Sequence, residues 1–260
     1  MPTRSWKRAG LLLLAGGLLS VAGPSMAAAQ SEDGFLFRRP RVSLGFNAGY
    51  AIPRAGSDVY DDLTRRHTLE DSDFQSPVFM GSLGIRASER FDVSLEVGYA
   101  GSRTRSEYRD WVEVVGDETL PIEQTTELER IPITASVRAY LWDRGRRISR
   151  FAWVPATWSP YVGLGGGWVH YSFQQEGDFV VEEPGADEGA IFRDRIESDG
   201  SGGIFHLSAG AEFSISPRFV LRGETRYSWA EADLDTTFGA YQEPIDLSGL
   251  QATVGIAVRF

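Results

Sequence analysis

Three groups of side chains in this 260-residue chain could carry chemistry. The first is a histidine and a serine two positions apart, His170 and Ser172. In a β-strand such residues point to the same face, as a general base and the nucleophile that it activates must do. Phe173 follows the serine, and the sequence does not place a carboxylate that would orient the histidine. We therefore expect His170 to be an interfacial or interior residue and expect no catalysis.

The second group is a dense run of acidic residues between positions 175 and 203. Its carboxylates are Glu176, Asp178, Glu182, Glu183, Asp187, Glu188, Asp194, Glu197 and Asp199. Carboxylate oxygens bind Ca²⁺ and Mg²⁺, but this run lacks the fixed spacing of a known cation-binding loop. The glycine-rich stretch at 163–167 is followed by neither a helix nor a lysine, so it predicts no phosphate-binding loop. We expect a solvated loop without a metal or a cofactor.

The third group consists of charged residues at alternate positions within apolar segments. They are Arg86, Asp92, Glu96, Arg138, Glu212, Arg222, Glu224 and Arg226. Counting from the short turns predicts three neighbouring pairs: Arg86 near Asp92, Glu212 diagonal to Arg222, and Glu96 at the height of Arg138. Charges inside a narrow structure are costly to bury unless they pair. The sequence therefore predicts an arginine–carboxylate network, which either closes the interior or exchanges its pairs as a gate for small solutes.

These residues lie on segments in which apolar and polar side chains alternate. Alternation predicts β-strands, because successive side chains point to opposite faces. Eight segments show it: residues 42–50, 78–87, 91–99, 131–141, 160–173, 205–215, 219–229 and 249–260. Each apolar face is about nine to eleven residues long, which is the length that a tilted strand needs to cross a bilayer. Glycines blur the phase of the segment 160–173 and are compatible with a bulge there.

The connections between these segments alternate in length. Long polar stretches near 51–76, 101–128, 175–203 and 231–248 follow the first, third, fifth and seventh segments. The tripeptides at 88–90 and 216–218 make short turns, and only the connection at 143–159 breaks the rule. The pattern predicts an antiparallel up-and-down sheet with long loops at one end and tight turns at the other.

Aromatic residues are expected to form two outward-facing bands. The long-loop band contains Tyr50, Phe79, Tyr99, Phe173, Phe205, Tyr227 and Trp229, and the short-turn band contains Phe91, Tyr161, Phe213, Phe219 and Phe260. Aromatic rings are favoured at both membrane–water interfaces. Small residues dominate the opposite strand faces, and these would make a poor exterior for a soluble sandwich or lipocalin-like barrel. Since unpaired backbone groups are not tolerated in lipid, the sheet must close. The predicted fold is all-β, a closed eight-stranded antiparallel transmembrane β-barrel.

The beginning of the chain predicts export. Residues 1–29 combine a basic start, an apolar run and small residues at 27–29, which indicate a signal peptide and leave 30–260 as the barrel domain. There is no cysteine, so neither disulfides nor a lipidated cysteine are expected. Removal of the three cations of the signal peptide takes the formal net charge from -10 to -13, which argues against nucleic acid as a partner.

The whole pattern resembles the small outer-membrane β-barrel proteins of Gram-negative bacteria, most closely the OmpA-like and OmpX-like superfamily. The sequences that carry the resemblance most directly are "PYVGLGGGW" at 160–168 and "VGIAVRF" at 254–260. The resemblance implies a location in the outer membrane, with outer-membrane lipid and lipopolysaccharide as neighbours. It also implies an assembly signal for the barrel-assembly machinery, formed by Val254, Ile256, Val258 and Phe260.

Three functions follow from these observations. The leading one is a non-enzymatic barrel with a structural role or with acidic loops that contact surface partners. The second is a narrow pore or a channel for small hydrophobic solutes. The third is a lipid A-modifying enzyme, because the His170–Ser172 pair is similar to the His-x-Ser pair of outer-membrane lipid A deacylases, although those enzymes have asparagine where Phe173 stands.

Overall fold

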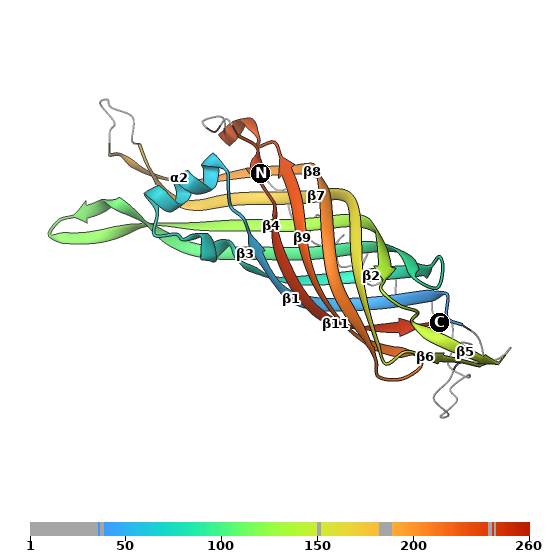
Figure 1. Ribbon diagram of the computed structural model, residues 1–260. Coiled ribbons are helices and arrows are strands. Elements are labelled where there is room, and N and C mark those ends of the chain that lie inside the picture. Colours follow the sequence, from blue (N-terminus) through green and yellow to red (C-terminus); the bar gives the residue numbers. More distant parts are fainter. Residues whose placement is uncertain (1–35, 37–38, 150–151, 182–188, 239–240, 242) are drawn as a thin grey trace, which may run out of the picture. The chain divides into compact units, whose positions relative to one another are not determined.

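The alternating segments form a closed ring of strands (Figure 1). The ring contains β1 (Val42–Pro53), β2 (Ser76–Arg86), β3 (Phe91–Val115), β4 (Glu118–Tyr140), β7 (Trp158–Val180), β8 (Ile191–Ser214), β9 (Phe219–Ala232) and β11 (Gly249–Arg259). Each strand pairs antiparallel with two neighbours, and β11 closes the ring by pairing with both β1 and β9. The prediction of an eight-stranded closed antiparallel barrel is confirmed.

The structure, a computed structural model, describes residues 36, 39–149, 152–181, 189–238, 241 and 243–260. The predicted signal peptide at 1–29 lies outside these residues. Within the described part of the chain, no helix combines the length and the apolar character needed to cross a membrane.

The two faces of the strands separate as the alternation predicts. On the outside, Val93, Leu207 and Val254 expose 44%, 47% and 58% of their surface. On the inside, Glu96 and Glu212 each expose only 3%. Apolar side chains with no protein cover therefore surround the ring, whereas charged side chains fill its interior, which we call the lumen. This arrangement requires an apolar environment outside the ring.

The two tripeptide turns use the same chemistry. Ser88 Oγ accepts hydrogen bonds from the backbone N–H groups of Arg90 (3.3 Å) and Phe91 (3.1 Å). Ser216 Oγ accepts from the N–H groups of Arg218 (3.3 Å) and Phe219 (3.0 Å) in the same way. A serine hydroxyl that satisfies the next backbone donors stabilises a tight turn. These turns define the short-turn end of the barrel.

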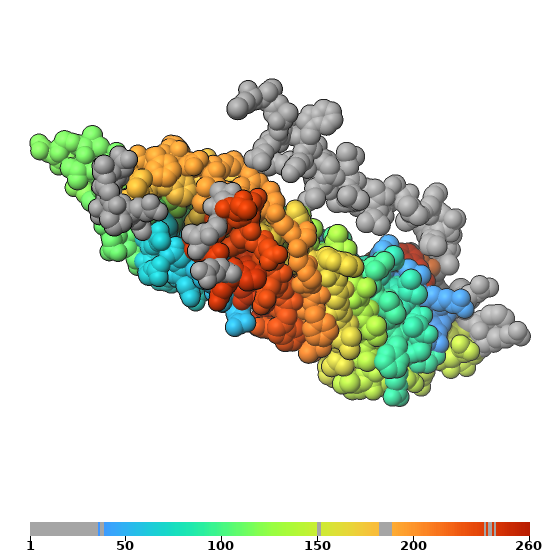
Figure 2. All heavy atoms as spheres, turned by 90° about the horizontal axis from the view of Figure 1, so that it is seen from above, coloured from blue at the N-terminus to red at the C-terminus, as the bar shows by residue number. Residues whose placement is uncertain are grey.

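At the opposite, long-hairpin end, the expected loops are shorter than predicted because the strands continue into them. Most of 101–128 belongs to a hairpin of β3 and β4 that turns at Gly116, whose φ of 67° favours glycine. Strands β7 and β8 likewise take up most of 175–203. Backbone pairing along β3–β4 and β7–β8 continues beyond the eight-stranded ring. The polar residues in these extensions therefore belong to solvent-exposed strands and not to loops. In both views the β3–β4 tip, coloured green, projects away from the barrel (Figures 1 and 2).

The other two long connections fold into a cap over the long-hairpin end. The first contains helix α2 (Asp58–Arg66) and the 3₁₀ turn η2 (Asp71–Phe74), and the second contains η3 (Thr236–Phe238) and β10 (Ile245–Asp246). Tyr60 Oη donates a 3.1 Å hydrogen bond to the carbonyl of Asp246 and thereby joins them. The cyan and red segments lie side by side accordingly (Figure 2).

The exceptional connection at the short-turn end is a small hairpin. Its strands β5 (Gly145–Ser149) and β6 (Ala152–Pro155) form a separate two-stranded sheet. Backbone hydrogen bonds of 3.0 Å in both directions join Trp153 of this hairpin to Leu36.

Strand β7 corrects two parts of the aromatic prediction. Tyr161 and Phe173 point into the barrel, with 2% and 0% of their surfaces exposed, so neither belongs to an outward band. Outward positions of β7 carry Leu164 and Trp168 instead. The register of β7 with both neighbours runs without a shift, so its glycines form no bulge. They permit close packing: a Cβ on Gly165 would lie 2.5 Å from a backbone oxygen and 2.7 Å from His206 Cε1.

Candidate functional site: an ion-pair network inside the barrel

The centre of the lumen contains a four-membered ring of alternating charges. Arg138 on β4 pairs with Glu96 on β3 and lies 3.5 Å from Glu224 on β9. Arg226 on β9 completes the ring, at 2.5 Å from Glu96 and 2.8 Å from Glu224. All four side chains are buried. Each arginine therefore neutralises both carboxylates, which is the condition under which buried charges are tolerated.

Neutral hydrogen-bond donors complete the central ring. Tyr161 Oη donates to Glu224 at 2.7 Å, and Ser94 and Ser136 donate to Glu96 at 3.1 and 3.3 Å. His206 shares a 3.0 Å hydrogen bond with Ser136 through its Nε2 atom. These residues come from strands on opposite sides of the ring, so the network spans the lumen.

A second layer lies nearer the short-turn end. Glu212 accepts from Arg222 at 2.8 Å and from Arg259 at 2.7 Å. Arg222 lies directly opposite Glu212 in the β8–β9 register, so the predicted diagonal position is wrong although the pairing is right. Tyr140 Oη also donates to Glu212 at 3.0 Å. One carboxylate thus satisfies two guanidinium groups and a phenol.

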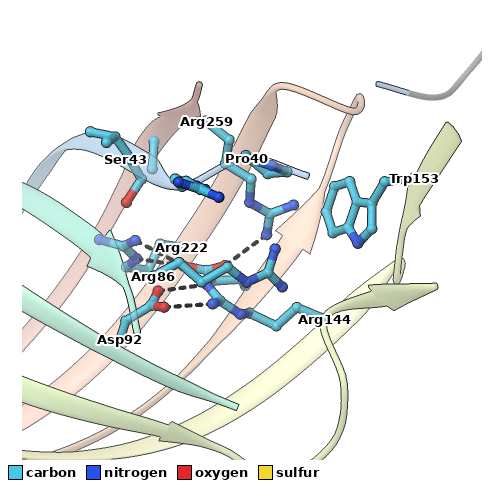
Figure 3. Close-up of a pocket in the computed structure, with 12 residues that line it drawn as sticks. Pro40, Ser43, Arg86, Asp92, Arg144, Trp153, Arg222 and Arg259 are labelled. Atoms are coloured by element: carbon cyan, nitrogen blue, oxygen red, sulfur yellow. Dashed lines mark hydrogen bonds and ion pairs between the residues drawn. The ribbon is translucent and has the colours of Figure 1, made fainter. Parts of the chain in front are cut away.

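The structure assigns a different partner to Asp92 from the one that the spacing suggested. Arg86 does lie opposite Asp92 in the β2–β3 register. However, the bidentate ion pair of Asp92, with two contacts of 2.5 Å, is made by Arg144 from the connection before β5 (Figure 3). The carboxylate nearest to Arg86 in the described structure is Glu89, at 4.0 Å.

The predicted set omits five charged or ring-bearing participants in these layers. They are Tyr140, Arg144, Tyr161, His206 and Arg259. Four of them stand on the inward side of a strand, so strict use of the alternation would have found them. Arg144 lies outside the ring strands, and the only signal for it was the unusual length of its connection.

An apolar cluster occupies the lumen towards the long-hairpin end. It combines inward residues of the strands with residues of the cap: Ala55, Val59, Tyr60, Leu63, Leu69, Phe74, Leu128, Val169, Tyr171, Phe173, Ala230, Ala232, Phe238, Ile245 and Leu247. The rings of Phe173 and Phe238 lie 5.4 Å apart, which connects β7 to the cap. Burial against such a cluster is what holds α2 and η3 in place.

The two other candidate groups lie away from the lumen. His170 is exposed and shares a 3.2 Å hydrogen bond with Ser201 on β8. Ser172 stands between Glu129 and Asp199 in the strand register. Of the acidic run, residues 182–188 lie outside the described structure. In the residues that are described, no group of three or more histidine, cysteine or acidic residues is arranged to hold a metal.

A closed ring of tilted strands with an apolar outer surface and an ionic interior defines a transmembrane β-barrel. The model of the outer membrane protein beta-barrel domain family matches residues 12–260, and the chain belongs to this family. Its location is the cell outer membrane. Members of this family have structural, adhesion or channel roles.

Several solved structures are similar to this chain. Neisserial surface protein A (NspA) is 13% identical over 89% of this chain and 100% of its own, with a TM-score of 0.42. The N-terminal barrel domain of Pseudomonas aeruginosa OprF is 13% identical over 85% and 100%, with a TM-score of 0.34. Ail of Yersinia pestis, in its complex with sucrose octasulfate, is 16% identical over 85% and 99%, with a TM-score of 0.38. No curated protein sequence matches the chain significantly.

Proposed function

We propose that the protein is a non-enzymatic outer-membrane barrel whose lumen is closed to solutes and whose role is structural or depends on its surface hairpins. The observation that carries this proposal is the four-membered ring of Glu96, Arg138, Glu224 and Arg226. Each member has two partners of opposite charge. Movement of any one side chain would break two contacts and leave buried charges unpaired, which costs several kcal/mol.

The dimensions of the barrel support a closed lumen. Eight strands enclose an interior that side chains fill. Here the side chains form successive layers: the pairs around Glu212 and Asp92, the central ring, and the apolar cluster beneath the cap. A solute would have to displace all of them, and the apolar cluster would not solvate a hydrated ion.

The surface role is supported by the long hairpins. In outer-membrane barrels short turns face the periplasm and longer loops face the outside, so we place the β3–β4 tip at the cell surface. Exposed apolar side chains there include Val112, Val114 and Leu120. Acidic residues Glu113, Asp117 and Glu118 accompany them. A projecting hairpin of this composition is suited to a partner with basic and apolar groups, while the apolar strand faces are suited to outer-membrane lipid and lipopolysaccharide.

Conductance in planar bilayers tests the closed lumen. We expect no discrete channel events from the wild-type protein or from a Glu123→Gln control, since Glu123 pairs with Arg105 on the exposed hairpin. Wild-type conductance that disappears in the Glu96→Gln, Arg138→Gln double variant would show instead that the charged lumen conducts. That result would replace the proposal by the narrow pore.

The non-enzymatic part of the proposal needs its own control, because His170 and Ser172 are both on the outward side of β7. We expect lipid A from cells that produce the wild-type protein, from cells that produce Ser172→Ala, and from cells without the protein to have the same mass. Lipid A that loses an acyl chain only in the presence of wild-type Ser172 would make the protein an enzyme.

A further inference from the structure

The short-turn end of the lumen contains a small cavity with an excess of positive charge (Figure 3). Its charged lining consists of Arg41, Arg86, Arg144, Arg222 and Arg259 with only two carboxylates, Asp92 and Glu212. Those carboxylates are already occupied by Arg144, Arg222 and Arg259. The cavity is therefore unlike the central ring, where cations and carboxylates are equal in number.

Of the buried arginines that line this cavity, Arg86 has the weakest ion pairing with the described residues. Its side chain is only 6% exposed, and its Nε and Nη2 atoms have no hydrogen-bond acceptor among them. Glu89 lies 4.0 Å away, but it is half exposed and pairs with Arg39. In Figure 3 the head of Arg86 lies near Arg144 and Trp153, without a dashed line of its own. A buried guanidinium in this condition requires an acceptor.

Other unused donors line the same cavity. Nε of Arg144 and the indole Nε1 of Trp153 are buried and also lack an acceptor among the described residues. The Trp153 ring lies 5.3 Å from the guanidinium of Arg86, and this cation–π contact satisfies none of the N–H groups. The backbone pairing of Trp153 with Leu36 holds the ring at the cavity.

We propose that this cavity is a binding site for an oxyanion of the phosphate type, with Arg86 as the principal donor and Arg144 and Trp153 beside it. The space in the cavity is about 20 Å³, enough for about one water-sized group. One oxyanion oxygen therefore enters, while the rest of the group remains at the mouth. Arginine forks suit this task because their paired N–H groups match phosphate oxygens. The proposal does not depend on whether the central ring closes the lumen.

Titration calorimetry with inorganic phosphate tests the site. The full-length protein is purified in octyl glucoside, whose headgroup has no phosphate, and sodium chloride at equal ionic strength is the reference. We expect saturable phosphate binding to the wild-type protein. Arg86→Gln should weaken it at least about tenfold, because a charge-assisted hydrogen bond is lost. Arg147→Gln removes an exposed arginine of β5, and it should change the affinity less than about twofold.

Two results would overturn the proposal. One is a wild-type titration that is the same as the chloride reference, and the other is equal phosphate affinity in the wild-type protein and Arg86→Gln. If Arg86→Gln does not fold, as judged by its mobility on an unboiled gel, Arg86→Lys serves instead. Lysine keeps the charge but has no fork, so binding should still weaken, and unchanged binding would again overturn the proposal.

The anion could be free phosphate or the headgroup of a phospholipid at the same mouth. The titration is therefore repeated in bicelles with and without phosphatidylglycerol. If the lipid headgroup is a ligand, phosphate binds the wild-type protein more weakly when phosphatidylglycerol is present. Arg86→Gln should remove this difference between the two kinds of bicelle. Unaltered phosphate binding supports the free oxyanion as the ligand.

Discussion

At the residue scale, Glu212 illustrates what burial demands of a charge in this barrel. Its carboxylate has 3% exposure and accepts from Arg222, Arg259 and Tyr140. These donors come from β9, β11 and β4, so a single side chain connects β8 to three other strands of the ring. Removing its charge would leave two buried guanidinium groups without their counter-charge, and breaking buried pairs in this way is strongly destabilising.

We therefore predict that Glu212→Gln lowers the free energy of unfolding by about 3–5 kcal/mol. Urea titration of the protein in detergent micelles measures it. The matched control is Glu123→Gln, whose exposed pair with Arg105 should contribute less than about 1 kcal/mol. Equal losses in the two variants would contradict the stabilising role of the buried network.

His67 is a second residue whose burial has a measurable consequence. It follows α2, it is buried, and the centre of its ring lies 4.4 Å from that of Tyr108 on β3. Burial lowers the pKa of His67 below its ordinary value of 6.5. The folded cap therefore prefers the neutral imidazole, whereas the unfolded cap takes up a proton at the ordinary pKa.

Because the folded cap disfavours protonated His67, we predict that the cap loses stability as the pH falls from about 6.5 towards the lowered pKa of folded His67. Above about pH 6.5, His67 is neutral in both states and makes no pH-dependent contribution to this stability. The protection factors of the α2 amides against hydrogen exchange, compared at pH 7.5 and pH 5, measure the effect. His67→Phe keeps an aromatic ring but cannot be protonated, so its α2 should lose this pH dependence. Retention of the full dependence in His67→Phe would assign it to another group.

At the element scale, β7 shows how one strand serves two environments. Its outward residues Val162, Leu164 and Trp168 expose half or more of their surfaces, whereas its inward residues Tyr161 and Tyr171 are buried. Glycines between the inward aromatics leave room for side chains from other strands. The division follows from the two-residue period of a strand, and it makes the effect of a substitution depend on the face where it occurs.

Leu164 lies near the middle of the apolar face of β7, opposite Leu207 of β8. We predict that Leu164→Arg lowers the free energy of unfolding in lipid vesicles by about 2–4 kcal/mol, since an arginine near the bilayer midplane must be desolvated. Ile148→Arg on the exposed β5 is the same kind of change outside the ring and should cost less than about 0.5 kcal/mol. Similar costs at the two positions would show that the outer face of β7 does not contact lipid.

At the scale of the whole molecule, closure depends on the two ends of the described chain. β1 and β11 pair from Ser43 with Arg259 to Pro53 with Gly249. The last residue still belongs to this ladder, because the N–H of Phe260 donates to the carbonyl of Val42 at 2.8 Å. Its ring, however, is partly exposed on the outside of the barrel. The backbone of Phe260 therefore closes the barrel, while its side chain remains available to another protein.

We predict that Phe260→Ala reduces the amount of protein inserted into the outer membrane of cells severalfold, because the ring is part of the proposed signal for the assembly machinery together with Val254, Ile256 and Val258. Refolding into micelles should change little, since the ring lies on the outer face of the barrel and takes no part in the buried network. The control is Phe213→Ala, an exposed aromatic on β8. Equal insertion of the two variants would remove the assembly role of Phe260.

The sidedness of the molecule can be measured directly because the chain contains no cysteine. We predict that Val114→Cys at the β3–β4 tip reacts with a membrane-impermeant maleimide on intact cells. Arg147→Cys in the β5–β6 hairpin should react only after the outer membrane is permeabilised. The reverse pattern would invert the assignment of the two ends.

The prediction of individual site residues succeeded where it depended on the period of a strand. Glu96 and Arg138 meet as expected, because both stand on inward positions of neighbouring strands. They are not at the same height, however: Arg138 lies opposite Asp92 in the register, and its long side chain reaches Glu96 four positions further along β3. It failed for Tyr161 and Phe173, since the glycines of β7 leave two phases open and a general preference of aromatics for the interface then suggested the wrong one. It also missed Arg144, which reaches Asp92 from a hairpin that no periodicity describes.

The alternation of side chains along the sequence predicts the number of membrane-crossing strands and, for most of them, the face that meets lipid. The need for closure follows as well, because lipid cannot satisfy unpaired backbone groups. The folded barrel alone shows which charges meet across the lumen and which buried arginine donors lack an acceptor among the described residues. The stagger between strands in the closed ring sets the heights at which side chains from distant strands face one another, and no local pattern encodes that stagger.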